Sequence, residues 1–342
     1  MARSWGFWTR YKLELLQRYL DAFTTTTKNR SPKRVYLDLF GGEPENVDRI
    51  TLNPIDGSAR IALSIDDPPF THLRFFELEP TAARLRQALT DEFPDRDWIV
   101  YSGDSNETIS QALSDLQSAD AAWAPTFAFI DPNGPHYTWN TLQALAGHKG
   151  LHAKTKVELW MLFPDPLFAR LLPRSGDVRP VDNAAITAMF GDAQWHAIWK
   201  AKLDDEIEPS DARDEYVNLM RWRLEGVLGY RWTHQLEIRN TRDLPIYHMI
   251  FATDSKAGHD IMTHLYNQAA EEFPSMAQEA RRLRDRLHRE AHGQFDLFST
   301  LDPPLDRTSW TSSTGGERKQ LYIHEAPDEP RPHDQGSCPY CR

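Results

Sequence analysis

Five short segments of nearly continuous apolar residues recur along the first half of the chain. They cover residues 35–40, 73–78, 98–101, 127–130 and 157–163. Strands that are covered on both faces of a parallel sheet have such unbroken apolar runs, whereas strands with one solvated face alternate apolar and polar residues. The pattern therefore predicts a parallel sheet with helices on both of its faces.

Segments of helical periodicity separate these predicted strands. Ahead of the first strand, residues 11–23 carry an apolar stripe at helical spacing, formed by Leu13, Leu16, Leu20 and Phe23. Pro80 is expected to open a second helix, and Ser105 or Asn106 is expected to cap a third. The alternation of strand and helix predicts an α/β protein with a doubly wound sheet.

The pattern changes after the fifth predicted strand. Residues 164–230 are mostly helical in character and contain several tryptophans, so we expect a helical insert whose tryptophans form a small core. A base-stacking platform is the alternative use of those tryptophans. Strand-like runs at 233–238 and 246–252 predict an antiparallel hairpin, because a single polar loop joins them.

The C-terminal part is expected to contain two helices followed by an irregular tail. The helices are predicted at about 258–273 and 276–292. Residues 300–342 are rich in proline and polar residues and carry few periodic apolar positions, which is typical of irregular segments.

Composition limits the classes of protein to consider. The chain has 342 residues, 40% of them apolar, and a formal net charge of −11. This negative charge argues against a protein that coats nucleic acid over its whole surface. Two local basic segments, residues 28–34 and 281–289, are candidate nucleic-acid contacts, although such charge runs are more often solvated faces. No run of ~18 apolar residues and no signal-peptide pattern occur, so we expect no membrane span.

Both cysteines, Cys338 and Cys341, lie at the C-terminus. The core can therefore contain no disulfide, and a reducing cytoplasm is the expected location. Together with His324 and His333 the cysteines offer four possible zinc ligands. A single C-x-x-C is weak evidence for such a site, so we expect two free thiols and no metal.

Candidate chemistry lies where the predicted strands end. Ligands of open parallel sheets bind beyond the carboxyl ends of the strands. The first strand carries Asp38 and runs into Gly41 and Gly42, which allow a close approach of the backbone to a ligand. Glu77 ends the second strand, where an acid can accept hydrogen bonds from two ribose hydroxyls.

The third and fourth strand ends complete this pattern. Asp104, followed by Ser105, comes after the third strand, where an acid can meet the exocyclic amine of an adenine. Asp131 and Pro132 follow the fourth strand. This order of a glycine loop, two acids and a D-P motif describes an S-adenosylmethionine site. A phosphate loop fits less well, because the third glycine and the G-K-[ST] motif are missing and Glu43 suits a cationic sulfonium better than a pyrophosphate.

These residues also resemble the three-Cys-motif partner proteins, whose members look like S-adenosylmethionine-dependent methyltransferases and are paired with a radical-S-adenosylmethionine-like protein that carries three cysteines. The resemblance covers about residues 8–270. The matching segments are Y-K-L-E-L-L-Q-R-Y-L-D-A-F (11–23), Y-L-D-L-F-G-G (36–42), D-G-S-A-R-I-A-L (56–63), F-F-E-L-E-P (75–80), G-D-S-N-E (103–107), F-A-F-I-D-P-N-G (127–134), A-M-F-G (188–191) and I-R-N-T-R-D-L-P-I-Y-H-M-I-F-A-T (238–253). Two loops depart from the family pattern, since the chain has D-L-F-G-G-E-P and D-P-N-G where D-L-F-A-G-P-G and D-P-F-G are usual.

The loop after the fourth strand suggests how an acceptor is held. Amino methyltransferases that act on bases use a D-P-P-[YF]-type loop, whose acid accepts from the amino group. Here Asp131 is expected to orient the acceptor beside Asn133, and His136 is a candidate general base, although an exposed loop histidine is the more common case. Tyr137 or Trp139 is expected to supply the stacking face.

Asp165 follows the fifth strand in the sequence F-P-D-P. Two roles are equally expected for it: lining the same pocket, or capping the helix that follows.

Together these observations predict a Rossmann-like class I methyltransferase fold with seven strands in the order 3-2-1-4-5-7-6. We expect residues 1–163 and 231–273 to form this domain, 164–230 a helical insert, 274–299 a C-terminal helix, and 300–342 the tail. The predicted function is methyl transfer from S-adenosylmethionine to a nitrogen of a nucleic-acid base or modified nucleotide. The alternative is a catalytically silent partner that docks or regulates the three-cysteine protein.

Overall fold

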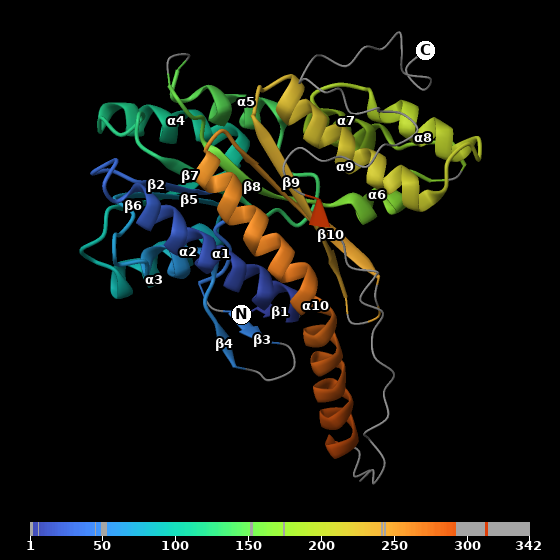
Figure 1. The fold of residues 1–342 in the computed structure, drawn as a ribbon, viewed down its shortest axis with the longest axis horizontal. Helices are drawn as coiled ribbons and strands as arrows, with labels where there is room; N and C mark the ends of the chain where they lie inside the picture. Colours follow the sequence, from blue (N-terminus) through green and yellow to red (C-terminus); the bar gives the residue numbers. More distant parts are fainter. Residues whose placement is uncertain are drawn as a thin grey trace.

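The structure, a computed structural model, describes residues 3–5, 7–44, 46–48, 53–150, 153–173, 175–240, 242, 244–291 and 312–313. Its centre is a large mixed sheet with helices on both faces (Figure 1), so the protein is of the mixed α/β class that the sequence predicts. All five apolar runs form strands that lie parallel to one another. They are β2 (Val35–Asp38), β5 (His72–Glu77), β6 (Trp98–Ser102), β7 (Thr126–Ile130) and β8 (Glu158–Phe163).

The predicted hairpin forms the antiparallel side of this sheet. It consists of β9 (Trp232–Arg239) and β10 (Pro245–Thr253), and β10 also pairs antiparallel with β8. β10 is therefore placed between its hairpin partner and the parallel strands. The complete order is β11-β9-β10-β8-β7-β2-β5-β6.

The sheet differs from the predicted one by an additional strand. β11 (Ser312–Ser313), from the segment expected to be irregular, pairs with Leu236 and Gln235 at the edge of β9. The sheet therefore has eight strands, and its full order is not the one predicted. The other seven strands, numbered among themselves along the chain, stand in the order 3-2-1-4-5-7-6.

A second, small sheet was not predicted at all. It is formed by β1 (Arg3–Trp5), β3 (Asn46–Asp48) and β4 (Pro54–Ile55), in the order β1-β3-β4. Strands of two or three residues are too short to show an alternating or continuous apolar pattern, which explains why the sequence gives no sign of them.

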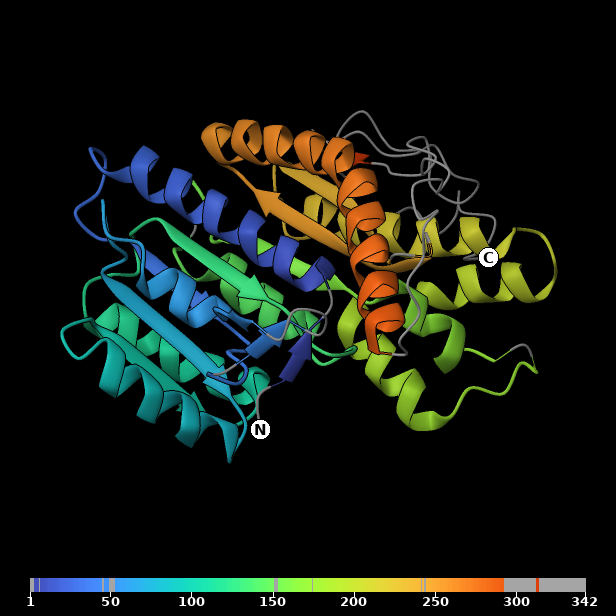
Figure 2. The ribbon, with the colours of Figure 1, turned by 90° about the horizontal axis from the view of Figure 1, so that it is seen from below.

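Each face of the large sheet is covered by its own set of helices (Figures 1 and 2). One face is packed against α1 (Phe7–Thr27), α2 (Ser58–Leu63), α3 (Thr81–Glu92) and α10 (Lys256–Ala291). The other face is packed against α4 (Ser105–Ser118), α5 (Trp139–Gly147), α6 (Asp165–Leu171), α7 (Pro180–Phe190), α8 (Trp195–Leu203) and α9 (Pro209–Gly226). Successive residues of a strand point to opposite faces of the sheet, and both faces are buried. The strands therefore have unbroken runs of apolar residues, as the sequence pattern predicted.

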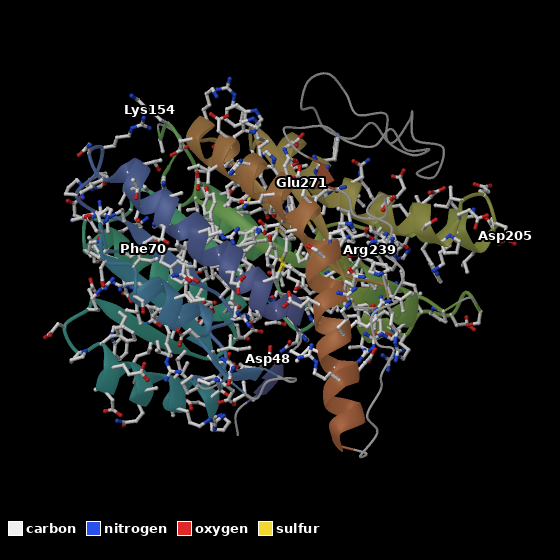
Figure 3. All side chains as sticks on the ribbon, turned by 60° about the horizontal axis from the view of Figure 1, so that its bottom comes forward. Asp48, Phe70, Lys154, Asp205, Arg239 and Glu271 are labelled. Atoms are coloured by element: carbon white, nitrogen blue, oxygen red, sulfur yellow. The ribbon has the colours of Figure 1, made fainter. Side chains whose placement is uncertain are left out.

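The core on the α1 face is built largely from aromatic side chains. Phe127 and Phe129 of β7 point to this face, whereas Ala128 and Ile130 point to the other. Phe70, which is labelled in Figure 3, stacks on Phe23 of α1 with ring centroids 5.8 Å apart. These ring contacts attach α1 firmly to the sheet.

Residues 164–230, the predicted insert, contain the helices α6 to α9. Trp195 and Trp222 are buried and Trp199 is half-buried, and Trp195 and Trp199 do not form a separate core. Trp195, 0% exposed, belongs to the same apolar cluster as the strand residues Ile130 and Met161. A base-stacking platform on this tryptophan is therefore excluded.

The prediction of two C-terminal helices is wrong, because α10 is continuous through Pro274. A proline within a helix costs about 3 kcal/mol, so a break was expected there. The residues on either side, Phe273 and Ala277, are both buried in the core of the α1 face. Phe273 packs on Tyr11 of α1 with ring centroids 4.4 Å apart, and this packing of α10 beside α1 (Figure 2) compensates for the proline.

Candidate functional site

A cavity of about 320 Å³ lies at the carboxyl ends of the parallel strands. We call it the strand-tip cavity. Eight of the site residues that the sequence singled out line it: Gly41, Gly42, Glu77, Asp104, Ser105, Asp131, Asn133 and His136. Asp38, Tyr137, Trp139 and Asp165 do not. Residues from four separate strand ends thus meet at one place, as expected for an open parallel sheet.

The Glu77 carboxylate joins the glycine loop to the second strand end by accepting hydrogen bonds from main-chain N–H groups. Gly42 has a φ of +73°, in the left-handed region, and its N–H donates to Oε2 of Glu77 at 2.8 Å. The N–H of Leu78 donates to Oε1 of the same carboxylate at 2.9 Å. An ionised carboxylate has about four lone-pair sites, so Glu77 keeps acceptor capacity for a ligand.

The third strand end differs from the predicted capping. Asp104, and neither Ser105 nor Asn106, is the N-cap of α4, since its side chain accepts from the N–H of Asn106 at 2.8 Å. Ser105 is instead the first residue of the helix. Its hydroxyl is buried, faces no hydrogen-bond partner in the part of the chain that the structure describes, and lies in the cavity wall. Such an unpaired polar atom marks a place for a ligand group.

Asn106 is a structural residue of the site that the sequence reasoning missed. Its Nδ2 donates to the main-chain oxygen of His136 at 2.7 Å, and its Oδ1 accepts from the N–H of Thr138 at 2.9 Å and from the hydroxyl of Thr141 at 2.7 Å. The third strand end is thereby tied to the loop that follows Asp131. An Asn in the first turn of a predicted helix was the available signal.

Asp38 does not line the cavity, so its predicted role as a direct ligand-binding residue is wrong. It is 0% exposed and faces the same side of β2 as Tyr36, whose hydroxyl donates to it at 3.3 Å. Ser58, which does line the cavity, also hydrogen-bonds to it. Burial raises the pKa of Asp38 to about 7.

Glu43 carries less free negative charge than the sequence suggested. Its carboxylate lines the cavity but is paired with Arg84 of α3, with Oε1 at 2.6 Å and Oε2 at 3.0 Å from the guanidinium. The hydrogen bond from Arg84 holds the pKa of Glu43 below its usual value. The argument that this acid attracts a sulfonium is therefore not supported, because Arg84 already compensates its charge.

Asp131 is bonded to a residue that the sequence reasoning missed. The ammonium group of Lys12, on α1, donates to Oδ2 of Asp131. Lys12 is 3% exposed, and its Nζ lies 5.6 Å from the ring centroid of Tyr247 and 6.0 Å from that of Phe129. Lys12 precedes Leu16 by one helical repeat, so a charge on the apolar stripe of α1 was the signal that could have revealed it.

A second cavity of about 560 Å³ lies on the other side of Asp131. We call it the Tyr247 cavity. Thr9, Asp131 and Asn133 line both cavities and form the boundary between them. Its other lining residues are Trp8, Lys12, Pro132, Gly134, Leu162, Pro164, Pro166, Leu167, Arg170, Pro245, Ile246 and Tyr247.

The predicted stacking residues are not available. Tyr137 is 0% exposed, and Trp139 is packed under the Arg223 guanidinium at 4.4 Å from its ring centroid. The aromatic side chain beside Asp131 is instead Tyr247, which comes from β10, more than a hundred residues along the chain. His136 is exposed and lines the strand-tip cavity, so its predicted position is compatible with the role of a base.

Asp165 has neither of its two expected roles. It lines neither cavity, and the N-cap of α6 is Pro164, with no side-chain bond. Oδ1 of Asp165 is 2.8 Å from Nδ1 of His248, and its Oδ2 is 3.3 Å from Nε of Arg213. Burial by itself would lower the pKa of His248, but the Asp165 carboxylate, together with the charges of Glu237 and Asp214, holds that pKa above the usual value.

The candidate basic patch at residues 28–34 is largely compensated. Lys28 is paired with Asp67 at 2.5 Å, and Lys33 lies 3.5 Å from Asp120. Arg34 is buried and donates to main-chain oxygens. The second patch, residues 281–289, lies in the C-terminal part of α10.

Neither a metal site nor a membrane span is found in the part of the chain that the structure describes. No group of three or more His, Cys, Asp or Glu there could hold a metal ion, and no described helix is long and apolar enough to cross a bilayer. The four possible zinc ligands of the tail, His324, His333, Cys338 and Cys341, lie outside the described residues.

Comparison with known proteins assigns no family. No family model matches the chain, and no curated protein matches it. Among solved structures, the crystal structure of a Legionella pneumophila str. Philadelphia 1 protein described as DUF519 is similar, with a TM-score of 0.43 and 10% sequence identity over 89% of this chain and 96% of that one. A similarity of this size does not assign a function.

Proposed function

We propose that this protein binds S-adenosylmethionine in the strand-tip cavity and transfers its methyl group to a nitrogen atom of a nucleic-acid base or modified nucleotide. The observation that carries the proposal is the boundary formed by Thr9, Asp131 and Asn133, which separates two cavities large enough for two reactants. A transfer between two bound molecules depends chiefly on holding the reacting atoms close together and aligned.

The residues of the strand-tip cavity suit a nucleoside. Glu77 offers acceptors for ribose hydroxyls, and Asp104 lies one strand further along, where it can accept from an adenine amine. The unpaired hydroxyl of Ser105 adds a polar group in the wall, and the left-handed Gly42 gives the ligand access to the backbone. S-adenosylmethionine supplies a methyl group on a positively charged sulfur.

The order of the seven long strands is also that of class I methyltransferases, which supports the proposal at the level of the fold. Folds alone do not define functions, so the argument depends on the site. Within it, Asp131 would accept a hydrogen bond from the acceptor nitrogen at a lone pair that Lys12, bonded to Oδ2, leaves available. Asn133 would offer its amide at the boundary, and His136 would take up a proton.

Isothermal titration calorimetry with S-adenosylmethionine tests the first half of the proposal. We expect saturable binding that Glu77→Ala weakens by about 10-fold or more, since a hydrogen bond to a charged group contributes about 1.5–3 kcal/mol. Asp91→Ala, on the exposed side of α3, is the matched control and should bind as the unaltered protein does. No heat at high cofactor concentration would reject the proposal.

The Lys12–Asp131 ion pair favours a second candidate function. Because the acid expected to orient an acceptor is already bonded, the protein could be a silent methyltransferase-like partner that docks or regulates a three-cysteine radical-S-adenosylmethionine-like protein. Incubation with tritiated S-adenosylmethionine and pools of DNA, RNA and protein separates the two. Cofactor binding without label transfer to any pool would favour the silent partner.

A further inference from the structure

Prolines form a large part of the walls of the Tyr247 cavity, beside the carboxylate of Asp131. Four prolines contribute to them, Pro132, Pro164, Pro166 and Pro245, and Trp8 adds an aromatic ring. Proline has no N–H, so these walls offer few main-chain donors to water. Flat apolar or aromatic groups are the ligands that such walls accommodate.

Tyr247 lines this cavity, and its buried hydroxyl is unpaired among the described residues. Its side chain is 8% exposed. Burial raises the pKa of Tyr247 well above its usual value, so the hydroxyl stays protonated and can donate. A buried hydroxyl left without a partner is destabilising, and a hydrogen bond from or to a ligand would offset that cost.

Lys12 shows what the polar end of the cavity accepts. Its ammonium group is bonded to Asp131 and lies near the Tyr247 and Phe129 rings, so this carboxylate accepts a hydrogen bond from an amine in those surroundings. The amino group of a ligand that donates to a remaining lone pair of Asp131 would therefore have similar hydrogen-bond chemistry.

Arg170 provides a second cation in the Tyr247 cavity, and unlike Lys12 it is exposed. It stands in the last turn of α6. No ion pair or hydrogen bond joins its guanidinium to another residue in the described ranges. An exposed guanidinium is well suited to hold a phosphate group through two parallel hydrogen bonds.

We propose that the Tyr247 cavity binds the methyl acceptor as a nucleoside monophosphate unit, with the base between the proline side chains of the walls, its amino group at Asp131 and its phosphate at Arg170. This inference rests on the proposed function and specifies its substrate. The chemistry of one base, one sugar and one phosphate is shared by a free nucleotide and by a nucleotide extruded from a strand. The compensated patch at 28–34 and the net charge of −11 favour the free nucleotide.

Calorimetric titration with nucleosides and nucleoside monophosphates tests the inference. It is carried out with saturating S-adenosylhomocysteine, so that an adenine nucleotide cannot enter the strand-tip cavity. We expect at least one of AMP, CMP and GMP, whose bases carry an amino group, to bind about 10-fold to 100-fold more tightly than its nucleoside, as a charged hydrogen bond allows. Equal affinities of every monophosphate and its nucleoside would overturn the inference.

Variants locate the contacts. Arg170→Ala should remove the preference for the monophosphate, and Arg170→Lys should restore part of it. Arg179→Ala, at an exposed arginine of the same helical insert, is the matched control and should keep the preference. Tyr247→Phe should weaken nucleoside and monophosphate alike, because it removes the hydroxyl and leaves the guanidinium. An Arg170→Ala protein with an unchanged preference would contradict the assignment.

Two further comparisons distinguish a free nucleotide from a nucleotide in a strand, and the failure of this inference from the failure of the proposed function. A short single-stranded oligonucleotide that binds where the monophosphates do not would assign the unit to a strand. Binding of S-adenosylhomocysteine with no binding of any nucleotide or oligonucleotide would reject this inference and leave the proposed function standing. Absence of both kinds of binding would reject both.

Discussion

Lys12 and Asp131 are bonded to each other across 119 positions of sequence, and this contact lies at the boundary of the two cavities. α1 supplies the lysine and β7 leads into the aspartate. The contact joins a helix that covers the sheet to the loop in which acceptor chemistry is expected. It therefore couples the packing of α1 to the state of the site.

The interaction free energy between Lys12 and Asp131 can be measured with a double-mutant cycle. Lys12→Met leaves the carboxylate of Asp131 without its partner, and we expect it to lower the free energy of unfolding by about 1–3 kcal/mol. Adding Asp131→Asn should recover part of that loss, because the uncompensated charge is removed. Urea denaturation of the four proteins gives the interaction energy. Additive losses would mean that the two groups do not interact.

Asp131→Ala should abolish methyl transfer while leaving the binding of S-adenosylmethionine nearly unchanged. The residue stands at the boundary and is expected to hold the acceptor nitrogen, whereas the ribose and adenine contacts lie at other strand ends. Label transfer and calorimetry on the same preparation provide the two readings. Transfer that persists in the variant would show that the acceptor is held elsewhere.

Asp38 should make the protein less stable as the pH rises from about 4 to about 7. Its pKa in the folded state is raised by burial to about 7, above the unfolded value of about 3.9, so the folded state binds the extra proton in that range. The stabilising effect is complete below the unfolded pKa and is lost as the pH passes through the folded one. Asp38→Asn should remove this component. Urea denaturation at pH 5 and pH 8 tests it, and an equal pH dependence in both proteins would contradict it.

His248 should respond to the loss of Asp165 in a way that NMR can detect. The carboxylate holds the pKa of His248 above its usual value despite burial, so Asp165→Asn should lower that pKa. In the unaltered protein the corresponding stability is present below the unfolded pKa of about 6.5 and is lost as the pH rises through the raised one. An imidazole pKa that is the same in both proteins would exclude the pair as its cause.

Gly191 and Gly176 form a matched pair for testing close packing. Both have positive φ values, +80° and +84°, so alanine is strained at either position. A Cβ at Gly191 would lie 2.3 Å from the Trp139 ring, whereas a Cβ at Gly176 meets no atom within 4 Å. We expect Gly191→Ala to lower the free energy of unfolding by about 1–3 kcal/mol more than Gly176→Ala does. Thermal unfolding compares the two, and equal losses would show that Trp139 moves aside.

Sequence patterns predicted the strands and most helices because both depend on local residues. The five apolar runs became β2, β5, β6, β7 and β8, and the hairpin became β9 and β10. The prediction failed where an element depends on distant contacts. α10 continues through Pro274 because Phe273 and Ala277 are buried against the sheet and α1, and no local rule expresses that burial.

The candidate site shows the same division. Strand ends are local features, and those of a parallel sheet meet at one edge, so Gly42, Glu77 and Asp131 could be placed together in advance. The direction of each side chain could not. Asp38 turns to the buried side of β2, and Trp139 is packed under Arg223.

What the sequence by itself determined is the alternation of strands and helices and the identity of the residues at the strand ends, since hydrophobic periodicity and turn residues act over a few positions. The tertiary structure alone decided that Lys12 donates a hydrogen bond to Asp131 and that Tyr247 and Arg170 line the adjoining cavity. Those partners come from α1, β10 and α6, and their meeting depends on how whole elements pack against the sheet.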